Sequence, residues 1–396
     1  MSATRGTHAA THVDPVVAPP PGEKRFPLID SMRGIAALCV LVTHAAAVSG
    51  ETIESPAGKV WAQLTVGVPI FFLVSGFLLY RPYFSARYHG YAAPSARTFF
   101  RRRILRIVPA YWAALLVLAI GLTLSGVLTS DWWVYFGFLQ AYQRDTVLQG
   151  IAPAWSLCVE VTFYLVLPMY AVLAARFSRR MAKARMVAVD LAVLGALGLA
   201  SVAIRTWAAD ADETLWFQTL PTTFDWFALG MALAVLSVAY DRRALPRPLQ
   251  ALAARPGACW LGAIAAFLAM CLLLDLPLTL VGRYTPAQVL VQHLTFGLVA
   301  LLLMLPAVFD DDAGGVPRRL LAWPTLAWLG TISYGIFLYN LTLCEWLQGR
   351  GVADWLPGGR FPPLVLVTFL ASVAAAAASY YALERPILRL KYRRRT

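Results

Sequence analysis

The chain is poor in charge: only 14% of its 396 residues are Asp, Glu, Lys or Arg, whereas 59% are hydrophobic. A soluble globular protein carries about a quarter charged residues, so this composition excludes a soluble domain of this size. Apolar runs of about 20 residues recur along the chain, and a helix of that length crosses the hydrocarbon core of a bilayer. We therefore predict an integral membrane protein.

Acidic residues are scarcer than basic ones, 21 against 34, and the formal net charge is +13. In a soluble protein this excess would suggest a nucleic-acid partner. Here the arginines cluster between the apolar runs, which is the pattern of cytoplasmic loops facing a bilayer. The sequence therefore predicts the lipid bilayer as a partner and no nucleic acid.

The sequence also lacks any CxxC spacing, so its five cysteines suggest small buried hydrophobic residues and no metal site. It lacks internal repeats and a soluble second domain as well. We predict one membrane domain over residues 26–390. A disordered polar tail at 1–25 and a basic tail at 391–396 flank it, and both are expected in the cytoplasm.

Ten apolar runs predict an all-α, multi-pass fold in the plasma (inner) membrane. They lie at about 28–49, 61–80, 107–128, 153–175, 186–207, 216–238, 257–276, 288–309, 322–347 and 362–383. A further aromatic run at 131–142 is ambiguous. If it is a short interfacial or re-entrant helix, every arginine-rich loop falls on one side, as the positive-inside rule requires. We therefore predict about ten transmembrane helices, with both termini cytoplasmic.

Two ionisable residues, Arg33 and His44, lie inside the first apolar run, eleven residues apart. Their side chains should differ by only ~20° around the helix axis and lie ~16 Å apart along it. Ionisable groups at membrane depth usually face a protein interior or a polar cavity. A desolvated neutral histidine can act as a general base on a hydroxyl. The alternative, an interhelical histidine satisfied by packing and a snorkelling arginine, stays open at this point.

A basic cluster precedes the third apolar run, and its members are Arg97, Arg101, Arg102, Arg103 and Arg106. Guanidinium groups bind phosphates through charge and paired hydrogen bonds. The cluster could therefore hold a phosphorylated cytosolic cofactor. The alternative is an ordinary cytoplasmic loop that contacts anionic lipid headgroups.

Other polar residues also lie in the apolar runs. Glu160 is predicted at about the depth of His44, where a carboxylate could orient an imidazole; another buried donor is the alternative partner. Ser75 and the glycine after it favour close helix packing over catalysis. Asp225 and His293 are further intramembrane groups, and the histidine is predicted to be structural.

Taken together, these motifs resemble the membrane acyltransferase-3 family over about residues 26–390. The segments that carry the resemblance are 29–44, 71–79, 101–112, 155–160, 333–339 and 383–386. The first is the most specific, because six positions match the family motif: Asp30, Arg33, Gly34, Ala36, Leu38 and His44. Two positions depart from the family pattern. Ser31 replaces a common glycine in the first segment. Asn340 stands where many members have histidine, so we assign Asn340 no role.

The resemblance implies an O-acyltransferase. Members of the family move acyl groups, often acetyl, from cytosolic acyl-CoA to hydroxyls of glycans, glycolipids or small natural products. Carried over by position, His44, Arg33 and Glu160 are the candidate catalytic residues. The candidate donor-binding residues are Arg101, Arg102, Arg103, Arg106 and Ser75.

The expected mechanism is direct acyl transfer within the bundle. The phosphates of CoA would dock on the inner arginines, and its pantetheine arm would follow the first helix to His44. This residue would deprotonate the acceptor, and Glu160 would support the imidazolium.

The alternative function is a transporter or flippase for an envelope lipid or sugar, although the internal repeats of many transporters are missing. The sequence does not specify the acceptor, the acyl chain length or the oligomeric state.

Overall fold

The computed structural model describes residues 26–122, 124, 126–211, 214–240, 244–279, 284–309, 315–357 and 359–389, and these contain helices and no strand. The long helices are α1 (Pro27–Ser49), α4 (Gly67–His89), α5 (Ala96–Gly121), α7 (Trp155–Phe177), α8 (Lys183–Asp210), α9 (Phe224–Ala239), α11 (Pro256–Leu273), α12 (Pro286–Val308), α15 (Ser333–Gln348) and α16 (Phe361–Ser379). The short helices are α2 (Glu51–Glu54), α3 (Gly58–Trp61), α6 (Trp132–Phe136), α10 (Arg247–Ala253), α13 (Val316–Leu321), α14 (Pro324–Thr331) and α17 (Arg385–Arg389). The predicted tails at 1–25 and 391–396 lie outside the described residues.

The predicted all-α, multi-pass fold is confirmed, because a helix overlaps each of the ten apolar runs. Eight helical segments are long and apolar enough to cross a membrane, and a ninth is the pair α14 and α15, which bends by 72° between them. Helix α9 is apolar but has only 16 residues. The ambiguous run forms α6, of five residues, and a 3-10 turn at Gln140–Tyr142, both too short to span. The protein is therefore a multi-pass membrane protein.

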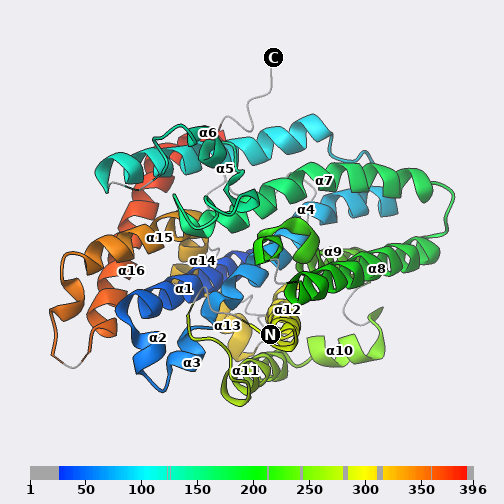
Figure 1. The fold of residues 1–396 in the computed structure, drawn as a ribbon. Coiled ribbons are helices and arrows are strands. Elements are labelled where there is room, and N and C mark those ends of the chain that lie inside the picture. Colours follow the sequence, from blue (N-terminus) through cyan, green and yellow to red (C-terminus); the bar gives the residue numbers. More distant parts are fainter. Residues whose placement is uncertain are drawn as a thin grey trace, which may run out of the picture.

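Helix α1 lies in the interior of the bundle, where it packs against α4, α14, α15 and α16 (Figure 1). In its most apolar stretch 61% of the residues are buried, compared with 22% in α8. Peripheral helices instead present large apolar side chains outward, such as Leu199, which is 74% exposed, and Leu273, which is 80% exposed. Since the chain spans a membrane, these leucines face lipid, and the protein core forms around α1.

Helices α4 and α9 cross at two glycines. A Cβ atom on Gly76 would lie 2.2 Å from the carbonyl oxygen of Phe227, and one on Gly230 would lie 2.0 Å from that of Leu73. Small residues at such crossings let two backbones approach closely, which is how helices associate in lipid. The crossing holds α4 against α9 and so sets the direction in which Ser75, next to Gly76, points.

A buried polar network joins α4 to the two helices that follow α5. The Tyr80 hydroxyl donates to Asp190 on α8 at 2.5 Å, and Arg87 on α4 forms an ion pair with the same carboxylate. Arg87 also donates to Ser178, just after α7, at 3.3 Å. Because charges at this depth need partners, the network anchors the basic end of α4.

His293 on α12 belongs to a second buried hydrogen-bond network. Its Nε2 lies 2.9 and 2.8 Å from the two carboxylate oxygens of Asp225 on α9. Ser201 on α8 donates to the same carboxylate at 3.0 Å, and the Trp226 ring stacks on the imidazole at 4.1 Å. The residue thus links three helices, in agreement with the predicted structural role.

Gly230→Ala should destabilise the protein by about 1–3 kcal/mol, because the added methyl group would overlap the α4 backbone. The matched control is Gly195→Ala in α8, where a Cβ atom would meet nothing within 4 Å; alanine there should be neutral or slightly stabilising. Thermal unfolding of the two purified variants in the same detergent measures the difference. Equal midpoints would contradict the proposed packing of α4 on α9.

Candidate active site

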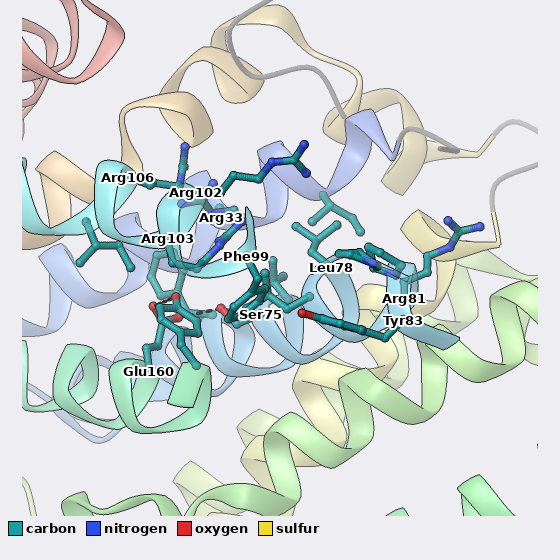
Figure 2. A pocket seen from close by; sticks show the side chains of 18 of the residues that line it. Arg33, Ser75, Leu78, Arg81, Tyr83, Phe99, Arg102, Arg103, Arg106 and Glu160 are labelled. Atoms are coloured by element: carbon teal, nitrogen blue, oxygen red, sulfur yellow. Dashed lines mark hydrogen bonds between the residues drawn. The ribbon is translucent and has the colours of Figure 1, made fainter. Parts of the chain in front are cut away.

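A cavity of about 510 Å³ opens among α1, α4, α5, α7 and α15. The beginning of α1, the later part of α4 and the first half of α5 contribute most of its walls. The segment between α4 and α5 closes one side, and the beginning of α7 forms the floor. In Figure 2, four arginines lie toward one side of the site, and Arg81 lies toward the other with Leu78 and Tyr83. The four are Arg33, Arg102, Arg103 and Arg106.

Positive charge is in excess in this cavity. Five arginines and two carboxylates line it: Arg33, Arg81, Arg102, Arg103, Arg106, Asp30 and Glu160. Arg33 is close enough to Arg106 and Glu160 to interact electrostatically with both. Since uncompensated charge at membrane depth is costly, the cavity is suited to an anionic ligand.

Helix α5 directs three of its arginines into the cavity. The helix is capped by Ser95, whose Oγ accepts a hydrogen bond from the Thr98 backbone N–H at 3.2 Å. Arg102 and Arg103 precede Arg106 by four and three residues, so the three side chains share a face. Arg101 belongs to another face: it is exposed and does not line the cavity. Arg97 is exposed too and does not line the cavity, so the structure brings together three of the five predicted arginines there.

Glu160 and Ser75 meet inside the cavity. The Ser75 hydroxyl donates to one carboxylate oxygen of Glu160 at 2.7 Å, and the Tyr164 hydroxyl donates to the other at 2.8 Å. The Arg103 guanidinium lies 5.8 Å from the centre of the Tyr164 ring. The carboxylate thus sits beneath the arginines, held by α4 and by its own helix. The predicted pairing of Glu160 with His44 is wrong, because both of its oxygens are bonded elsewhere.

The partner of His44 is Asn340. The Nδ1 of the buried histidine lies 2.6 Å from the Asn340 Oδ1 on α15, and the asparagine side chain is fully buried. Asn340, to which the family motif gave no role, is therefore the hydrogen-bond partner of the candidate base. The signal available in the sequence was an amide side chain within an apolar run, which at membrane depth needs a partner.

His44 does not line the cavity. Two phenylalanines mark the boundary: Phe71 on α4 and Phe337 on α15 both line it, with their ring centres 5.9 Å apart in an edge-to-face contact. Phe337 precedes Asn340 by one helical turn. Neither the histidine nor its partner lines the cavity.

The face of α1 between Arg33 and His44 is apolar. Ala37 and Leu41 lie on the intervening turns, and both belong to a buried cluster against which Phe71 packs. The predicted continuous route along α1 is therefore interrupted in this structure. Although the two polar side chains share a helix face, Arg33 lines the cavity and His44 does not.

Tyr83 lines the other end of the cavity and is 8% exposed. Its ring packs on Phe99 at 6.0 Å, and Figure 2 shows its hydroxyl pointing inward, toward Ser75. Among the described residues this buried hydroxyl has no hydrogen-bond partner. A buried polar group left unpaired costs free energy, so a ligand that supplies the partner would gain affinity. Sequence analysis did not single out this tyrosine.

Comparison with known proteins agrees with the resemblance. A family model described as an acyltransferase domain matches residues 26–381. Nodulation protein 10 of Rhizobium leguminosarum bv. viciae is 28% identical over 91% of this chain and 93% of its own length. Acyltransferase MdmB of Streptomyces mycarofaciens is 24% identical, with 95% of each chain covered. The putative peptidoglycan O-acetyltransferase YrhL of Bacillus subtilis is 26% identical over 91% of this chain, which spans 55% of that relative. No solved structure matches the chain.

Proposed function

This chain belongs to the acyltransferase-3 family, and we propose that it transfers an acyl group, with acetyl the first candidate, from cytosolic acyl-CoA to a hydroxyl. The acceptor is a glycan, a glycolipid or a small natural product. A relative named as a peptidoglycan O-acetyltransferase favours the glycan among these. The observation that carries the choice of donor is the cavity, in which five arginines face only two carboxylates.

The arginines of the cavity support the choice of acyl-CoA as donor, because its phosphate groups are anionic. Phosphate groups would bind the guanidinium groups of Arg102, Arg103 and Arg106 through charge-assisted hydrogen bonds. Arg33 would hold the donor deeper in the bundle. Glu160 stays in the proposed site with a revised role. It offsets part of the positive charge, and it orients Arg103 through Tyr164, over whose ring that guanidinium lies.

His44 is the proposed general base. The acceptor oxygen attacks the thioester carbonyl while its proton passes to the imidazole. The carbon–sulfur bond then breaks, and the departing thiolate takes the proton back, which leaves an ester and free CoA. Since His44 does not line the donor cavity, the reaction requires a rearrangement that brings the thioester and the imidazole together.

A transporter, the alternative function, need not consume acyl-CoA, whereas the proposed enzyme must. Mass spectrometry of envelope glycans, lipids and secreted metabolites would identify the acceptor, comparing a strain that lacks the gene with its parent. We propose that the protein lies in the plasma membrane. The basic end of the bundle would face the cytosol, because acyl-CoA is available there.

Arg103→Ala should weaken CoA binding about 10- to 100-fold, since a charge-assisted hydrogen bond contributes about 1.5–3 kcal/mol. Arg179→Ala is the control, because that arginine is exposed and does not line the cavity. Calorimetric titration of CoA into each purified variant measures the affinities. Binding of CoA by the Arg103 variant at the wild-type affinity would count against the proposed donor site.

Tyr83→Phe should raise the KM for acetyl-CoA about 5- to 10-fold and leave kcat unchanged, because one hydrogen bond to the donor is lost. Tyr88→Phe on the same helix is the control, since that side chain does not line the cavity. Initial rates of CoA release in membrane preparations give both constants. An unchanged KM would show that the unpaired hydroxyl plays no part in donor binding.

His44→Ala should lower acyl transfer about 10²- to 10⁴-fold, the usual contribution of a positioned general base, while CoA binding stays as in the wild type. His89→Ala, at the exposed end of α4, serves as the control. Acyl-CoA hydrolysis and acyl transfer are measured on the same purified samples. Full activity in the His44 variant would remove this residue from the mechanism.

A further inference from the structure

The hydrogen bond between His44 and Asn340 determines which imidazole nitrogen carries the proton. Both side chains are buried, and the Nδ1 to Oδ1 distance of 2.6 Å is that of a short hydrogen bond. A neutral imidazole has one N–H and one acceptor nitrogen, and its neighbours decide which nitrogen holds the proton. The partner atom on the asparagine therefore determines which nitrogen of His44 is free to accept a proton.

The orientation of the Asn340 amide is set by its own helix. Its Nδ2 lies 3.0 Å from the carbonyl oxygen of Ile336 and 2.8 Å from that of Phe337. Carbonyl oxygens only accept hydrogen bonds, so the NH2 group must occupy this position and its two protons are both used. A flipped amide would place its oxygen against two carbonyl oxygens and its NH2 group against His44. The side-chain oxygen therefore faces the imidazole.

We infer that Asn340 is a positioning residue that holds His44 as the Nδ1–H tautomer and leaves Nε2 as the atom that takes the acceptor's proton. The amide oxygen cannot donate, so the hydrogen bond requires a proton on Nδ1. The neutral ring then has its lone pair on Nε2. This inference rests on the proposed role of His44 as general base and specifies which of its nitrogens reacts.

The arrangement also fixes the direction of the reactive nitrogen. The asparagine binds the backbone of α15 through its NH2 group and binds α1 through its oxygen, so the ring has a defined rotation about its χ angles. Its Nε2 points away from Asn340, and the proton it takes from the hydroxyl is later returned to the departing thiolate of CoA. An amide holds the ring in this way without adding a charge, whereas a carboxylate would stabilise the imidazolium.

The test compares two substitutions at the same position. Asn340→Asp keeps an oxygen acceptor for Nδ1–H; its second oxygen replaces the NH2 group and can face the carbonyl oxygens of Ile336 and Phe337 only as a protonated OH. Asn340→Leu loses both the acceptor and the NH2 group. Each variant is assayed at its own pH optimum, with Thr342→Val, another buried residue on α15, as the control. CoA affinity, measured on the same samples, reports whether the donor cavity is intact.

The expected result is a kcat lowered about 10²- to 10³-fold in Asn340→Leu, as for a general base held in the wrong tautomer, with kcat largely restored in Asn340→Asp. The KM for acetyl-CoA should change in neither. A purely structural asparagine would instead make both variants equally poor, because both lose the NH2 group that binds the α15 backbone. Equal loss of kcat, or wild-type kcat in Asn340→Leu, would overturn the inference.

A spectroscopic measurement addresses the tautomer directly. The chain has five histidines, so solid-state NMR of protein labelled with 15N-histidine is tractable, and the His44 signals are those missing from His44→Gln. We expect a protonated Nδ1 and an unprotonated Nε2 in the wild type, and the opposite tautomer or a mixture in Asn340→Leu. An Nε2–H tautomer in the wild type would refute the assignment. Should His44→Ala retain full activity, the proposed function of His44 fails, whatever tautomer the NMR spectrum shows.

Discussion

Uncompensated positive charge inside a membrane-spanning bundle is the constraint on which the rest of this structure depends. Five arginines share one cavity with two carboxylates, and lipid offers no solvation for the excess. The bundle responds by placing Glu160 beneath the arginines, with Ser75 and Tyr164 donating to its two oxygens. The positive charge that Glu160 does not neutralise attracts an anionic ligand and contributes to its binding energy.

The same constraint explains why α1 lies in the interior. A helix that carries Arg33 and His44 cannot face lipid on that side, so α4, α14, α15 and α16 cover it. Close coverage needs small residues at the crossings: a Cβ atom on Gly330 of α14 would lie 1.8 Å from the Asp30 carbonyl oxygen. The peripheral helices present leucines such as Leu199 and Leu273 to lipid.

The donor cavity and the contact of His44 with Asn340 are separate, because neither of these two residues lines the cavity. The cavity is cationic, whereas the contact is buried and joins an imidazole to a neutral amide. In the proposed reaction this division has a use, because a thioester kept apart from the base until an acceptor arrives is protected from hydrolysis. The thioester and the base must then be brought together in each catalytic cycle.

By itself the sequence determined the helices, their order, the non-spanning segment at 131–142, the family and the arginines of α5, because hydropathy and charge are properties of one segment at a time. It also identified the polar residues that need partners at membrane depth. Only the tertiary structure decided which partner each one has: Glu160 with Ser75, His44 with Asn340, and an unpaired hydroxyl on Tyr83. The physical reason is that these contacts depend on how each helix is rotated against its neighbours. That rotation is set by packing at crossings such as Gly76 against Gly230, between residues far apart in the chain.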